Sequence, residues 1–78
     1  MIFLERPNCH LCEDAWALLA DVTTTEGVRR LDIDGDDALV VEYGLRIPVL
    51  LSDRGAVLAE GVFDRAALAA ALQTERGR

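Results

Sequence analysis

Two cysteines lie three residues apart in the segment Cys9-His10-Leu11-Cys12, and the chain has no others. Such a pair can exchange disulfides, as nucleophile and resolving thiol, or bind a soft metal ion. Alternatively, both cysteines are small buried hydrophobic residues without a chemical role. A structural zinc site commonly uses four Cys or His ligands, whereas this chain has two Cys and one His. We therefore expect redox chemistry at the pair and no zinc or other metal site.

The cysteine pair stands where a predicted strand gives way to a predicted helix. Ile2-Phe3-Leu4 indicates a buried strand, and Arg6-Pro7-Asn8 indicates the turn that ends it. Apolar residues then recur at helical spacing, at Ala15, Trp16, Leu18, Leu19 and Val22. Cys9, at the start of this helix, should be the more exposed thiol, and the free backbone N–H groups there should lower its pKa. Cys12 should be more shielded, which suits a nucleophile at Cys9 and a resolving thiol at Cys12.

The rest of the chain predicts a small α/β domain with the element order β-α-β-α-β-β-α. Further strands are expected over 28–33, 49–51 and 57–59, and helices over 38–43 and from Asp64 to about Leu72. Crossover helices make the first strands parallel, and the turn Asp53-Arg54-Gly55 makes the last pair antiparallel. The result is a four-stranded mixed sheet flanked by helices. We expect one domain over residues 1–78, with an ordered core to residue 73 and a frayed tail over 74–78.

The charge balance restricts the partners. Fourteen acidic against eight basic residues give a net charge of −6 over 78 residues, which argues against nucleic acid or an anionic membrane as partner. No apolar run is long enough to span a membrane, and the first residues lack the features of a signal peptide. We expect a soluble, cytoplasmic monomer.

Three landmarks together give the chain a resemblance to glutaredoxin-like members of the thioredoxin fold, and to the short bacterial glutaredoxin-like proteins in particular. Cys9-x-x-Cys12 follows the first strand, Ile47-Pro48 opens the third strand, and Gly61 with Asp64 precedes the last helix. The resemblance implies a cis peptide bond before Pro48, facing the cysteines. It also implies that the backbone of Ile47 pairs with an extended peptide or with glutathione.

The same resemblance implies a thiol-disulfide oxidoreductase that reduces protein disulfides or glutathione mixed disulfides. No bound cofactor is expected, and glutathione is a candidate reductant. The residues that would bind substrate are Arg6, His10, Arg46, Ile47, Pro48, Gly61 and Asp64. Arg6 would either steady the Cys9 thiolate or lie solvated on the surface. His10 would either tune that thiol or simply be exposed.

Several positions depart from the glutaredoxin pattern. His10-Leu11 stands where Pro-Tyr is usual, and Arg46-Ile47-Pro48 stands where Thr-Val-Pro is usual. Val62 replaces the second glycine of a Gly-Gly pair, and Arg65 replaces the second of two acidic residues. The β-carbon of Val62 would obstruct close backbone approach, so these departures put glutathione binding in question.

Two other functions remain open and rank lower. Small copper and mercury carriers also place a Cys-x-x-Cys loop between a strand and a helix, but usually have Met where this chain has Pro7. The chain would also end in a helix, unlike those carriers. The second alternative is a redox-inert module that binds a protein through the groove around Pro48.

Overall fold

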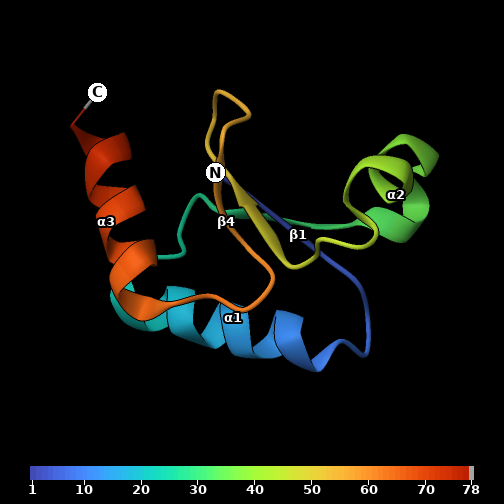
Figure 1. Ribbon diagram of the computed structural model, residues 1–78, viewed down its shortest axis with the longest axis horizontal. Helices are drawn as coiled ribbons and strands as arrows, with labels where there is room; N and C mark the ends of the chain where they lie inside the picture. The colour runs from blue at the N-terminus through green and yellow to red at the C-terminus, as the bar shows by residue number, and fades with distance from the viewer. Residues whose placement is uncertain (78) are drawn as a thin grey trace.

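Four short strands and three α-helices follow the predicted order in the computed structural model, which describes residues 1–77 (Figure 1). The elements are β1 (Ile2–Glu5), α1 (His10–Val22), β2 (Arg29–Asp32), the 3₁₀ turn η1 (Ile33–Gly35), α2 (Asp37–Tyr43), β3 (Val49–Leu51), β4 (Val57–Glu60) and α3 (Arg65–Arg76). No helix among these described residues is long and apolar enough to cross a membrane.

The sheet brings the functional segments to one of its ends. Its strand order is β2-β1-β3-β4, with β1 parallel to β2 and antiparallel to β3, and with β3 antiparallel to β4. Leu4 pairs with Val49, and Val49 pairs with Glu60. Strands β1, β2 and β4 therefore finish at the end where β3 begins. We call this the cysteine end and define it as the connections over residues 5–14, 32–48 and 60–62.

Side chains alternate between the two faces of the sheet and build a core on each. Phe3 and Leu50 face one way and pack with buried residues of α1 and α3, among them Leu19 and Leu68. Leu4 and the neighbouring strand residues Val49 and Leu51 face the other way, where Ile33 and α2 cover them. This arrangement leaves α1 and α3 on one face and α2 on the other (Figure 1). Both faces of the central strands β1 and β3 are thereby buried, whereas β2 and β4 at the edges of the sheet stay partly exposed.

Trp16 lies at the rim of the first core. Its ring meets Phe3 edge-on with centroids 5.2 Å apart, and the guanidinium of Arg30 lies 4.3 Å above it. Arg30 in turn donates two hydrogen bonds of 2.7 Å to the carboxylate of Glu5. The indole is half-buried, which fits the expectation of a core residue near a polar rim.

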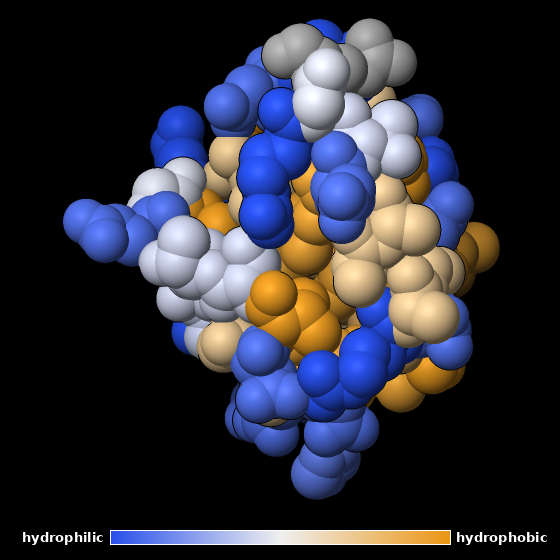
Figure 2. Space-filling model, turned by 90° about the vertical axis from the view of Figure 1, so that its left-hand side faces the viewer, coloured by the Kyte–Doolittle hydropathy of each residue, from blue (hydrophilic) through white to orange (hydrophobic). Residues whose placement is uncertain are grey.

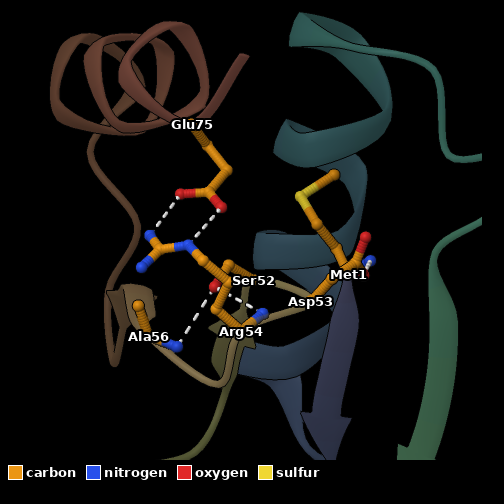
Figure 3. Close-up of polar contacts among 6 residues, drawn as sticks. All are labelled: Met1, Ser52, Asp53, Arg54, Ala56 and Glu75. Atoms are coloured by element: carbon orange, nitrogen blue, oxygen red, sulfur yellow. Dashed lines mark hydrogen bonds and ion pairs between the residues drawn. The ribbon is translucent and has the colours of Figure 1, made fainter. Parts of the chain in front are cut away.

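The last helix is longer than the sequence predicts. α3 continues to Arg76, so residues 74–76 are helical, where a frayed tail was expected. The cause is a long-range contact, because Arg54 of the β3–β4 turn binds Glu75 through two nitrogens at 3.2 and 2.9 Å (Figure 3). The remaining tail prediction at Arg78 lies outside the described residues.

The β3–β4 turn lies at the end of the sheet opposite the cysteine end. Buried Ser52 holds it, since its hydroxyl accepts hydrogen bonds from the backbone N–H groups of Arg54 and Ala56 at 3.2 and 3.1 Å (Figure 3). The N-terminal amine also pairs with Asp53 of this turn. On the α3 side of the molecule, apolar surface reaches solvent between hydrophilic side chains (Figure 2), and the exposed alanines Ala66, Ala67, Ala69 and Ala70 belong to α3.

Candidate functional site

Cys9 and Cys12 are joined by a disulfide at the start of α1, with their Cα atoms 5.2 Å apart. Cys9 is the N-cap residue, and its sulfur accepts a hydrogen bond of 3.2 Å from the backbone N–H of Cys12. Cys9 is half-buried, whereas Cys12 is 1% exposed. The order of exposure is the one expected from the sequence. An incoming thiolate or disulfide can therefore reach the Cys9 sulfur more easily than that of Cys12.

A tight turn sets the direction in which Cys9 enters the helix. Asn8 has a φ of +57°, in the left-handed region that asparagine tolerates better than most residues. The next residue, Cys9, is extended, with φ −110° and ψ 108°, and its carbonyl accepts the first helical hydrogen bond from Glu13 at 3.0 Å. The backbone turns between these two residues, which leaves the Cys9 sulfur beside the first free N–H groups of the helix.

The Arg6 side chain is directed toward α2 and its flanking segments. Its Nε donates to Asp34 at 2.7 Å, and a second nitrogen donates to the carbonyl of Gly44 at 3.3 Å. These bonds tie the segment between β1 and Cys9 to the two segments that flank α2. Arg6 is thus neither a freely solvated arginine nor paired with the disulfide, the two alternatives that its sequence position suggested.

Pro48 and Gly61 meet at the same end of the sheet as the cysteines. The Ile47–Pro48 peptide bond is cis, and Pro48 is buried. The N–H of Gly61 donates to the carbonyl oxygens of Pro48, at 2.8 Å, and Arg46, at 3.2 Å. Because β1 ends where β3 begins, the segment that leads to Cys9 and the Pro48 segment lie at neighbouring strand ends.

The backbone of Ile47 is only partly available to a substrate. Its N–H donates to the carbonyl of Tyr43 at 3.1 Å, which extends the hydrogen bonding at the end of α2. No residue in the described part of the chain donates to the Ile47 carbonyl oxygen. The resemblance implied that Ile47 would pair with an extended ligand, and here only its carbonyl is open for that purpose.

Arg46 is held by two carboxylates. Its guanidinium bonds to Glu60 at 2.7 Å and to Glu42 at 3.3 Å, and lies 5.0 Å from the ring centroid of Tyr43. The hydrogen bond to Glu60 raises the pKa of Arg46, and the same bond lowers the pKa of Glu60 below its ordinary value. A cation expected to meet substrate is therefore already neutralised by neighbouring residues.

The other two predicted binding residues, His10 and Asp64, lie at the starts of α1 and α3. His10 is 97% exposed, and its Nδ1 lies 3.8 Å from Glu13. Asp64 caps α3, as predicted, by accepting from the N–H of Ala67 at 2.8 Å. Arg65 pairs with Asp21, in the last turn of α1, and so points away from the cysteines.

Four large apolar side chains are exposed at this end, and exposure was predicted from the sequence for none of them: Leu11, Val41, Leu45 and Val62. For Leu11, Leu45 and Val62, an apolar residue in a turn or beside a cysteine is the signal that could have found them. Within residues 1–77, no cluster of three or more His, Cys, Asp or Glu side chains is placed to hold a metal ion. A shallow hollow of about 160 Å³ is lined by Met1, Thr23, Leu72, Glu75 and Arg76, none of which belongs to the cysteine end.

Comparisons with known proteins agree with this architecture. The family described as glutaredoxin-like domain (DUF836) matches residues 1–73. An X-ray structure of a Northeast Structural Genomics target protein from X. campestris superimposes with a TM-score of 0.83 at 36% sequence identity. That match covers 94% of this chain and 95% of the other. No curated protein matches the sequence significantly. The mixed sheet and three helices are consistent with the predicted thioredoxin fold.

Proposed function

The chain belongs to the glutaredoxin-like (DUF836) family, and we propose on this premise that it is a thiol-disulfide oxidoreductase. The observation that carries the proposal is the unequal pair at the start of α1. The Cys9 sulfur is partly accessible and accepts a backbone hydrogen bond, and Cys12 is buried one turn away. A thiolate at Cys9 would be stabilised by the same N–H group and by the helix dipole.

The reaction takes place in two exchange steps. In the reduced protein, the Cys9 thiolate attacks one sulfur of a substrate disulfide, a bond forms between these two sulfurs, and the other substrate sulfur leaves as a thiolate. The Cys12 thiolate then attacks the Cys9 sulfur and displaces the second substrate thiolate. Two electrons pass to the substrate, and the Cys9–Cys12 disulfide seen in the structure is the product. Regeneration needs a thiol reductant, for which glutathione is a candidate.

The surroundings of the pair support a protein disulfide or a glutathione mixed disulfide as substrate. The open carbonyl of Ile47, beside buried Pro48, offers one backbone acceptor for an extended chain. We place this activity in the reducing cytoplasm, in a monomer without a bound cofactor. A reducing compartment is where a lone exchangeable cysteine pair is useful as a catalyst rather than as a permanent cross-link.

A redox titration tests the proposal. Purified protein is equilibrated in graded mixtures of reduced and oxidised glutathione, free thiols are alkylated, and the intact mass is measured. We expect reversible conversion between two free thiols and one Cys9–Cys12 disulfide, at a potential within the range of about −270 to −120 mV that the wider thioredoxin superfamily spans. If both thiols stay free in oxidising mixtures, the oxidoreductase function is wrong, and Cu(I) binding becomes the next test.

A further inference from the structure

Negative charge is concentrated at the cysteine end. The three connections that define it carry nine carboxylates and two arginines, a net charge of −7. The rest of the chain carries five carboxylates and six arginines, a net charge of +1. Including Arg30, which reaches Glu5 from β2, still leaves −6 at this end. The net negative charge of the molecule therefore falls in the three connections at the end of the sheet that carries the cysteine pair.

Much of this charge is not neutralised locally. Asp14, Asp36 and Asp37 are exposed, and none of them forms an ion pair with a described residue. The only described partner of the Asp36 carboxylate is a neutral one, the backbone N–H of Leu39, which donates a hydrogen bond of 3.2 Å to it. The field of such carboxylates extends into the solvent from which a substrate approaches.

Apolar surface is concentrated at the same end. Five large apolar side chains are conspicuously exposed among the described residues: Leu11, Val41, Leu45, Val57 and Val62. Only Val57 lies outside the cysteine end. Leu11 stands between the two cysteines, and Val62 is 78% exposed directly after Gly61, which is bonded to Pro48. Exposed apolar side chains beside a reactive group favour contact with a protein segment over contact with a small charged molecule.

The groups that would attract an anionic ligand are already engaged. Arg6 donates a hydrogen bond to Asp34, and Arg46 donates hydrogen bonds to Glu60 and Glu42. The Ile47 N–H donates a hydrogen bond to the carbonyl of Tyr43. Glutathione carries a net negative charge and would approach an end of charge −7 without a free cation among these groups. A cationic partner would be attracted by the same field.

We propose that the preferred substrate of the Cys9–Cys12 pair is a protein disulfide flanked by cationic and apolar side chains, and that glutathione disulfide is a poor substrate. This inference rests on the proposed function and specifies its substrate class. The chemistry is the two-step exchange described above, and charge acts on the rate at which substrate reaches Cys9.

Two synthetic peptides test the inference. Each contains one intramolecular disulfide and the same apolar residues, and the flanking positions are Lys in one peptide and Glu in the other. The reduced protein is oxidised by the peptide in a single turnover. Samples are alkylated at successive times, and the intact mass of the protein is measured to give the rate. Each rate is divided by the rate of the same peptide with dithiothreitol, because flanking charge also changes the reactivity of the disulfide itself.

We expect the normalised rate with the Lys peptide to be about ten-fold or more above that with the Glu peptide at low salt. The ratio should fall toward one at 1 M salt, where the screening length is about 3 Å, against about 30 Å at 0.01 M. Glutathione disulfide, normalised in the same way, should be as slow as the Glu peptide. Equal normalised rates at low salt, or a faster Glu peptide, would overturn the inference and leave the oxidoreductase function intact.

Matched variants locate the effect. Asp14→Asn and Asp37→Asn each remove one exposed carboxylate at the cysteine end, and Glu26→Gln removes one from the α1–β2 loop at the other end. Each of the first two should lower the Lys-to-Glu rate ratio about two-fold, and Glu26→Gln should leave it unchanged. Equal effects of all three variants would show that the net charge of the whole molecule, and not the charge at the cysteine end, sets the Lys-to-Glu rate ratio. That result would contradict the inference. No reaction with any disulfide would instead refute the oxidoreductase function itself.

Discussion

The backbone N–H of Gly61 donates to the carbonyl oxygen of Pro48 over 2.8 Å and so fastens the turn after β4 to the residue that precedes β3. Gly61 makes this bond with a φ of +69°, in the left-handed region, where a β-carbon is disfavoured. An added β-carbon would meet no atom within 4 Å. The requirement for glycine is therefore one of backbone conformation and not of space.

Gly61→Ala should lower the free energy of unfolding by about 1–2 kcal/mol, measured by urea denaturation. Gly55→Ala is a matched variant, since Gly55 also has a positive φ, of +83°, and open space around it, but lies in the β3–β4 turn. Both variants should lose similar stability, and only Gly61→Ala should slow disulfide exchange. Gly35→Ala, without a positive φ, should cost little, and a Gly61→Ala variant as stable as Gly35→Ala would contradict this account.

The ion pair between Glu60 and Arg46 should make stability depend on pH. The hydrogen bond from Arg46 lowers the pKa of Glu60 in the folded protein below its ordinary value of 4.5. The ion pair therefore stabilises the fold fully above pH 4.5. This contribution is lost as the pH falls through the lowered pKa that Glu60 has in the folded protein. Urea denaturation across this range should show Glu60→Gln less stable than the parent protein at neutral pH, with the difference vanishing in acid. A stability difference between Glu60→Gln and the parent protein that persists unchanged in acid would contradict this account.

Leu50 lies in the centre of β3 and is completely buried. Leu50→Ala should therefore cost about 2–5 kcal/mol, from lost burial and from the cavity left behind. Leu45→Ala removes the same atoms from a side chain that is fully exposed and should leave the free energy of unfolding within about 0.5 kcal/mol of the parent value. Similar losses in both variants would mean that Leu45 is covered in solution, for example by a second copy of the chain.

The two cysteines should give opposite results when replaced. Cys9→Ser should abolish exchange with a disulfide substrate, because the accessible sulfur is lost. Cys12→Ser should still attack through Cys9 but should stop at a mixed disulfide, seen as a mass increase equal to one substrate thiol. Full activity in Cys9→Ser, or an adduct that forms on Cys12 instead, would reverse the proposed roles.

The fold was predictable where the signals were local. The helical spacing from Ala15 to Val22, the cap at Asp64 and the turn at Asp53-Arg54-Gly55 all lie within a few residues of the structure that they specify. One local signal was missed at the end of β2, which was predicted to reach Ile33. The Asp32 carboxylate accepts a hydrogen bond from the N–H of Asp34, and this turns the chain into η1 at Ile33.

Contacts between distant residues could not be predicted. Glu75 extends α3 by binding Arg54, 21 residues earlier, and Arg6 is drawn away from the cysteines by Asp34, 28 residues later. The hydrogen bond from the Ile47 N–H to the carbonyl of Tyr43 depends on how the chain leaves α2. The sequence therefore located the reactive pair but not the state of the groups around it.

The separation of charge between the two ends of the sheet gives the molecule a permanent electric dipole. On a positively charged support, such as an anion-exchange resin or a cationic electrode coating, the molecule would orient with its cysteine pair toward the surface. Adsorption in that orientation would cover Cys9, whereas a covalent tether near the β3–β4 turn would leave it facing the solution.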